Sequence, residues 1–355
     1  MKQVPTITDR LYQPAADTLI NRMFIRLLRD KRDMPFLNLI IHMSLTLIPL
    51  GVALFFPLPP ALWWTAALIY IYLSNFKFKS PYGLMLHCIS HRRLFRHQYN
   101  WLMIHIIWVL GPFIGHTPQT YFSHHMGMHH AENNMPEDES STMPYQRDSL
   151  KDFLRYLGSF LVQGMYNLVT YLKRRNRKQL AKKALEGELS FFFLCAVLLF
   201  VNAKATLIVF VLPFLLLRLI MMVGNWTQHS MVDPDDPANP YKNCITTINV
   251  KYNHKCWNDG YHSSHHARPA LHWSEHPVVF QQTLDTYAAN KAIVFDGLDF
   301  GAVFLCLITK NYKKLATHLI NINGTFANEG EAIDVLKLRT RRFSQEDISK
   351  LLLPG

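Results

Sequence analysis

Histidine is clustered in this 355-residue chain at spacings that suit metal binding. Most of its 18 histidines fall into short runs. The runs are HCISH (His87, His91), HHMGMHH (His124, His125, His129, His130), HSSHH (His262, His265, His266) and, more sparsely, NWTQH (Asn225, His229). Residues three or four apart on a helix project from one face, so each run directs its side chains toward a common point. One such run is weak evidence, but several together indicate a metal centre.

The number of these imidazoles predicts two metal ions. A zinc site usually takes four ligands and an octahedral ion six, whereas nine or ten donors are present here. Imidazole binds iron, zinc and copper alike, so the ligand type does not identify the metal, and the reaction that each metal supports must be considered. Two irons that activate O2 fit a neutral nitrogen donor set best. A dizinc hydrolase would usually include carboxylates, and no Asp or Glu lies inside the runs; copper is a third alternative.

Long apolar blocks predict the elements that hold the histidines. The chain is 49% hydrophobic, and a membrane span needs about 20 apolar residues. The blocks poor in charge are residues 35–57, 60–76, 188–202 and 205–223. Short breaks at LPP and AKA pair them into two hairpins. We therefore expect an all-α integral membrane protein with four transmembrane helices, buried helices of a soluble protein being the alternative.

The distribution of basic residues predicts the orientation. The segment before residue 35 and the central loop are rich in Arg and Lys, whereas the two hairpin turns contain only Lys204. The positive-inside rule then puts both termini and the histidine runs in the cytoplasm, which means the inner membrane if the source is bacterial. The net charge of +12 is attributed to this topology and to attraction for anionic lipid or an acidic partner. We find no nucleic-acid motif and expect no nucleic-acid partner, and we expect no cleaved signal peptide.

Two further apolar stretches are not expected to cross the membrane. A crossing by residues 98–115 would place HCISH and HHMGMHH on opposite sides, so this stretch is predicted to be interfacial or re-entrant. Asp296 and Asp299 would be costly in lipid, so residues 292–308 are predicted to form a helix on the cytosolic part or the membrane surface.

The cysteines do not compete for the metal site. Five are present, scattered singly and without a CxxC pair. Thiolate zinc and iron–sulfur sites are therefore not expected, and the thiols are predicted to be free.

The combination of runs resembles the integral-membrane fatty acid desaturases and their hydroxylase relatives, across roughly residues 35–280. The resemblance implies four transmembrane helices that carry a cytosolic helical cap with a histidine-rich di-iron site. It implies residues 1–34 as a cytosolic segment, 35–321 as the desaturase-like domain and 322–355 as a tail. Within the domain, residues 77–187 and 224–321 would form the cap.

The resemblance also implies the ligands, position by position. They are His87, His91, His125, His129, His130, His229, His262, His265 and His266, with Asn225 near one iron through water. The second run departs from the commonest form, HxxHH, because three residues separate His125 from His129. His124 is the alternative first ligand. Residues that could orient a ligating imidazole are His124, Glu132, Asp233 and Asp259.

The implied activity is O2-dependent oxidation of an unactivated C–H bond in a fatty acyl chain, with desaturation as the default. Oxidative decarboxylation of a free medium-chain fatty acid to a 1-alkene is the alternative, and hydroxylation of a fatty acid or alkane is third. The implied partners are the bilayer, the fatty acyl substrate and a separate electron donor, either a ferredoxin, a rubredoxin or a cytochrome with its reductase. The alternative in which the protein is not an enzyme is a membrane scaffold or transporter that binds a metal or haem.

Overall fold

The computed structural model describes residues 1–352 and is mostly helical, as predicted. Contacts within the chain divide it into two compact units. Unit 1 comprises Met1–Leu11, Met128–Leu168 and Met221–Gly355, and unit 2 comprises Tyr12–Gly127 and Val169–Ile220. Each unit thus combines segments that are far apart in the sequence.

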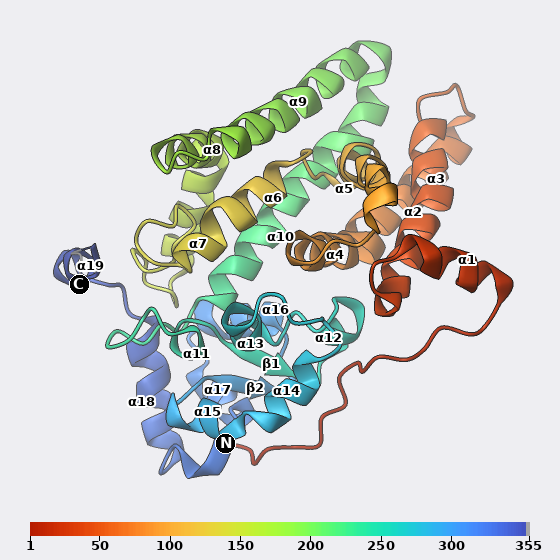
Figure 1. Cartoon of the computed structure of the whole chain (residues 1–355). Coiled ribbons are helices and arrows are strands. Elements are labelled where there is room, and N and C mark those ends of the chain that lie inside the picture. The colour runs from red at the N-terminus through yellow and green to blue at the C-terminus, as the bar shows by residue number, and fades with distance from the viewer. Residues whose placement is uncertain (353–355) are drawn as a thin grey trace. The chain divides into compact units, whose positions relative to one another are not determined.

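Unit 2 contains the apolar helices. Its elements are α1 (Leu19–Leu27), η1 (Lys31–Asp33), α2 (Met34–Ala53), α3 (Pro60–Tyr72), η2 (Leu73–Phe78), α4 (Lys79–His91), η3 (His97–Leu102), η4 (His105–Leu110), α5 (Gly111–Ile114), α6 (Thr120–His124), α9 (Lys178–Thr206) and η6 (Leu207–Val211). Figure 1 shows α2 and α3 as neighbouring helices, and the two are in contact. The break between them lies at the predicted LPP, and Pro60 begins α3 at a position where proline is well tolerated.

In the part of the chain that the structure describes, two helical stretches are long and apolar enough to cross a membrane. These are Lys31–Ala53 and Lys178–Gln228. The second contains both predicted segments, 188–202 and 205–223, and a kink divides it where the turn between them was predicted. The only non-helical residue within α9 is Asn202, with φ −157° and ψ 96°, just before the AKA tripeptide. The count of four spans is not confirmed and stays a prediction.

The stretch 98–115 is helical almost throughout, and the helix changes type along it through η3, η4 and α5. Gly115 ends the last piece with a φ of 94°, a conformation that glycine adopts readily. That this stretch does not cross the membrane stays a prediction.

Unit 1 combines two short strands with mostly short helices. Its elements are α7 (His130–Glu132), α11 (Pro240–Asn243), β1 (Thr246–Ile248), α12 (Lys251–Lys255), α13 (His262–Ala267), α14 (His276–Gln282), α15 (Leu284–Ala289), β2 (Val294–Asp296), α16 (Phe300–Ile308), α17 (Tyr312–His318), η7 (Ile322–Gly324), α18 (Glu329–Thr340) and α19 (Gln345–Leu352). Three elements cross the boundary between the units: η5 (His125–His129), α8 (Leu150–Arg174) and α10 (Leu212–Gln228).

A two-stranded parallel sheet corrects the all-α expectation. β1 pairs with β2 in the register Thr246 to Val294 and Ile248 to Asp296, and both strands lie within unit 1 (Figure 1). The single helix expected over 292–308 is therefore a strand followed by α16. Gly297, with a φ of 76°, makes the turn between them, and Asp299 caps α16 by accepting from the backbone N–H of Ala302.

Candidate metal centre

Four imidazoles converge inside unit 1. We call them the histidine quartet: His129, His229, His262 and His266. One ring nitrogen of each lies within 4.8 Å of one ring nitrogen of every other. The Nε2 atom of His262 is 3.3 Å from that of His229 and 3.0 Å from that of His266. Three separate stretches of the sequence therefore supply one cluster.

Helical geometry delivers the quartet. His262 and His266 are four residues apart on α13 and so share one of its faces. His229 directly follows α10, and its N–H still donates to the carbonyl of Asn225 in the helical pattern. His129 is the last residue of the π-helix η5. Each of the four histidines therefore lies on or immediately beside a regular helical backbone.

Gly260 allows the chain to enter α13. The Gly260 N–H donates to Asn253 Oδ1 at 2.9 Å, and its carbonyl accepts from Thr247 N at 2.8 Å. A Cβ atom at this position would lie 2.4 Å from the carbonyl oxygen of Thr247. Only glycine fits between β1 and the start of the third histidine run.

Burial lowers the pKa of two members of the quartet. His229 is fully buried, and desolvation lowers its pKa to about 3, with the neighbouring His129 adding to the effect. Desolvation, followed by the other histidines, lowers the pKa of His266 well below 6.5. Neutral imidazole is the form that binds a metal, so both lone pairs are available at pH 7.

The outer nitrogens of two quartet members have defined hydrogen-bond partners. Asp138 Oδ2 accepts from His129 Nδ1 at 2.9 Å, and this carboxylate is buried. Asn243 Oδ1 accepts from His229 Nδ1 at 3.0 Å. With Nδ1 engaged in this way, the Nε2 atom of each ring is left to face the cluster.

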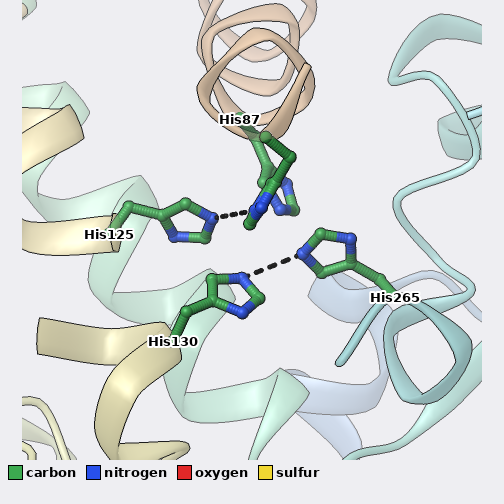
Figure 2. A group of neighbouring side chains, drawn as sticks. His87, His125, His130 and His265 are labelled. Atoms are coloured by element: carbon green, nitrogen blue, oxygen red, sulfur yellow. Dashed lines mark hydrogen bonds between the residues drawn. The ribbon is translucent and has the colours of Figure 1, made fainter. Parts of the chain in front are cut away.

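Two more histidines of unit 1 form a second, smaller arrangement, which we call the histidine pair. His130 and His265 turn their rings toward one another (Figure 2), and their Nε2 atoms are 3.0 Å apart. His130 comes from α7 and His265 from the same α13 helix that supplies the quartet.

Unit 2 contains a third group, the histidine trio of His87, His91 and His125. The Nε2 atoms of His91 and His125 are 3.0 Å apart, and the rings of His87 and His125 lie 4.5 Å apart between centroids. His87 projects from α4 and His125 begins η5 (Figure 2). Tyr121, one turn before His125, stacks on its ring at 5.3 Å. The trio therefore combines two helices of the apolar unit.

The π-helix η5 accounts for the unusual spacing of the second histidine run. A π-helix bonds residue i to i+5 and so holds one more residue per turn than an α-helix. The extra residue of HxxxHH relative to HxxHH is accommodated in this wide turn at His125–His129. His125 joins the trio, whereas His124, at the end of α6, belongs to none of the three groups.

The nitrogen spacings fit metal coordination. With a metal–nitrogen bond of about 2.1 Å, adjacent nitrogens lie about 3.0 Å apart at right angles and about 3.4 Å apart at the tetrahedral angle. The measured separations of 3.0 and 3.3 Å fall in this range. The Nε2 atom of His262 therefore lies at separations from those of His229 and His266 that suit ligands of one ion.

The other predicted site residues have defined surroundings. The side-chain amide of Asn225 donates to the Ser140 carbonyl at 3.0 Å and to the Tyr156 hydroxyl at 2.6 Å. Asp233 forms an ion pair with Arg339, and Asp259 accepts from Gln228 and Tyr252. Glu132 is the last residue of α7. Their expected roles beside a metal stay predictions.

Sequence reasoning missed Asp138, Asn243 and Gly260. Asp138 lies nine residues after His129 in the segment PEDES, where two glutamates flank it. Nothing in that segment distinguishes the one carboxylate that turns back to the ligand. Asn243 carries no signal at all in the sequence, because its contact with His229 depends on the fold of the loop after α10.

A family model for fatty acid desaturases matches residues 61–297, which is more than half of the chain and includes every histidine run. The chain belongs to the fatty acid desaturase family. No curated protein and no solved structure gives a significant match.

Membership of the desaturase family confirms the resemblance found in the sequence. It makes the protein a membrane-bound oxidoreductase that acts on fatty acyl chains and receives electrons from a donor. The two long apolar helices agree with a membrane location. The histidine groups are compatible with the di-iron site implied by the family.

Proposed function

We propose that this protein uses O2 and a di-iron centre to desaturate a fatty acyl chain. The observation that carries the proposal is the histidine quartet: four imidazoles, three of them buried, whose ring nitrogens lie within 4.8 Å of one another, in a chain of the desaturase family. A structural zinc site would need only one such group, whereas the chain has nine clustered imidazoles.

The quartet would hold one iron, and His87, His91, His125, His130 and His265 are proposed as further ligands of the di-iron centre. Neither three nor two imidazoles make a full coordination shell. One helical backbone runs from Thr120 to Glu132 through α6, η5 and α7. His125 and His130 are five residues apart along it, and five residues correspond to one hydrogen-bonded turn of a π-helix. Asn225 is proposed to lie near one iron through water.

When bound, the two irons would supply the O2 chemistry that removes hydrogen from an unactivated C–H bond. The balance is R–CH2–CH2–R′ + O2 + 2 e⁻ + 2 H⁺ → R–CH=CH–R′ + 2 H2O. Two electrons come from the acyl chain and two from the donor. A ferredoxin, a rubredoxin or a cytochrome with its reductase is proposed for this role.

The contribution of the polypeptide is to hold neutral donors in fixed positions. Nine imidazoles add no negative charge, so the positive charge of the ions is left largely uncompensated by the ligands. Desolvation lowers the pKa of His229 and His266 and so keeps these two imidazoles unprotonated at neutral pH. Asp138 is a buried carboxylate in direct contact with a proposed ligand.

We also propose how the protein lies in the membrane. Four spans in two hairpins, with both termini and the metal centre on the cytoplasmic side, would give an acyl chain access from the bilayer. The long apolar helices and the basic segments of the sequence support this topology.

The test uses the full-length protein purified in detergent with a reductase and ferredoxin. Lauric acid and palmitoyl-CoA are supplied separately, and products are identified by mass spectrometry together with the iron content. A chain-length-conserving alkene is the expected product. A terminal alkene one carbon shorter would identify the decarboxylase, and a hydroxy acid the hydroxylase. Absence of all oxidised products from an iron-loaded protein would refute the proposal.

A further inference from the structure

The loop that follows the second histidine run folds back beneath the quartet. Asn133 and Asn134 both adopt left-handed backbone conformations, with φ of 49° and 60°. Asparagine tolerates this conformation better than most residues. The helix therefore stops immediately after α7, and the chain reverses so that Asp138 reaches the ring of His129.

Several donors hold the Asp138 carboxylate in one orientation. Its Oδ1 atom accepts from the Ser140 backbone N–H at 2.9 Å and from the Ser140 hydroxyl at 2.6 Å. Its Oδ2 atom accepts from Asn134 N at 3.2 Å as well as from His129 Nδ1. A carboxylate fixed at both oxygens has little freedom to move away from the imidazole.

Asn134 links this carboxylate to the second engaged ligand. Its side-chain amide donates to Asn243 Oδ1 at 2.9 Å, the same oxygen that accepts from His229 Nδ1. Asn243 in turn donates to the carbonyls of Asn133 and Pro237. Asn134, Asp138 and Asn243 are all buried. One continuous polar network therefore runs from His129 to His229.

We propose that Asp138 is a positioning residue for the quartet, and that Asn134 and Asn243 extend its effect to His229. The carboxylate fixes the tautomer of His129 with the proton on Nδ1, orients the ring and makes Nε2 a stronger donor to the metal. This inference rests on the proposed function only for the identity of the metal. The network would orient the same nitrogens toward any divalent ion.

A purely structural role for Asp138 is the competing explanation, because its bonds to Asn134 and Ser140 also shape the loop. The two roles differ in what they change. A structural role predicts lower stability of the metal-free protein with unchanged affinity in the folded fraction. A positioning role predicts weaker metal binding at one site, even where stability is preserved.

The experiment compares Asp138→Asn with a matched control, Asp148→Asn, in the full-length protein. Asp148 is also a buried carboxylate of unit 1, but it accepts from the Tyr312 hydroxyl and the Gln146 amide. Metal-free protein is titrated with Co²⁺ and with Fe²⁺ against a competing chelator, and thermal unfolding of each metal-free variant is measured.

Asp138→Asn is expected to weaken one class of site by about 10- to 100-fold and to leave the other class unchanged. Asp148→Asn is expected to leave both at the wild-type affinity. Asp138→Glu, which restores the charge, is expected to recover part of the loss. Wild-type affinity at both sites in Asp138→Asn, or an equal loss in Asp148→Asn, would overturn the proposal.

A milder variant keeps the test decisive if Asp138→Asn does not fold. Ser140→Ala removes the 2.6 Å hydroxyl contact to the carboxylate and is expected to weaken the same class of site by about 3-fold. Unchanged Co²⁺ affinity in that folded variant would contradict the proposal. Because the readout is metal affinity, the result stands apart from whether any acyl chain is oxidised.

Discussion

The histidine quartet and the histidine trio both gather imidazoles that are proposed to bind metal, but the fold supports them differently. The quartet lies within one unit, draws on three stretches of sequence and has Asp138 and Asn243 behind two of its rings. The trio comes from two helices of the apolar unit, and Tyr121 stacks on one of its rings. The quartet supplies four nitrogens from one unit, whereas the trio supplies three.

The two proposed iron sites should therefore differ in how far one unit can form them without residues from elsewhere. A site whose ligands and orienting partners belong to one compact unit is preorganised by the fold of that unit. A site to which one unit supplies only three ligands needs further donor atoms to fill the coordination shell of its ion. We therefore expect the quartet ion to be the more tightly held of the two.

The largest effect is expected from His262→Ala. This change removes a quartet ligand whose Nε2 faces those of two others, so iron should fall from about two to about one per chain and product formation should drop at least about 100-fold. Iron analysis and product quantification check this outcome. His318→Ala is the control, since His318 bonds a backbone carbonyl. Wild-type iron in His262→Ala would remove the quartet from the metal centre.

His91→Ala tests the trio in the same assay. It should also leave about one iron, but the ion that remains should resist a chelator as well as the tighter ion of the wild-type protein. Chelator-dependent iron loss followed over time measures this. If both ions are lost in His91→Ala, the two sites are not independent and the comparison above fails.

Arg147→Met tests how the fold of unit 1 supports the quartet. The fully buried Arg147 guanidinium donates to the carbonyls of Thr142, Ser230 and Arg339, among others. Leaving these carbonyls without a donor should destabilise the protein by about 3 kcal/mol. Thermal unfolding in detergent measures the loss. The exposed Arg155→Met should change stability by no more than about 0.5 kcal/mol, and an equal effect of both would contradict the prediction.

The smallest effect is a pH dependence of the metal-free protein. The folded-state pKa of His229 is lowered to about 3 by burial, whereas the unfolded chain titrates near 6.5. Below about pH 6.5 the unfolded state binds a proton that the folded quartet excludes, so the free energy of unfolding should fall by up to about 1.4 kcal/mol per pH unit for this group. Unfolding temperatures at pH 7.5, 6.5 and 5.5 should decline in that order, and less steeply in His229→Gln. A flat or rising profile would contradict the assigned burial.

The parts of the site that sequence could predict are those set by local helical geometry. His262 and His266 are four residues apart, and helical spacing alone places them on one face. The family match confirms what the combination of runs indicated. The apolar segments 35–57 and 188–223 were recognisable because a bilayer-spanning helix is defined by length and hydropathy.

Other features escaped because their signal is weak or absent in the sequence. β1 and β2 have three residues each, too few to show a period of two. The spacing of His125 and His129 suggested one shared face, yet His129 joins the quartet and His125 the trio.

The sequence by itself determined the histidine runs with helical spacing, the long apolar segments and the resemblance to desaturases. These features can be recognised in the sequence because each depends on residues that are close together along the chain. Only the tertiary structure decided which imidazoles share a cluster and that Asp138 and Asn243 stand behind two of them. Those contacts join residues 9 to 14 positions apart through reversing loops, and across more than 130 positions for His129 and His266. Their distances are set by how the loops and helices pack, which no local spacing encodes.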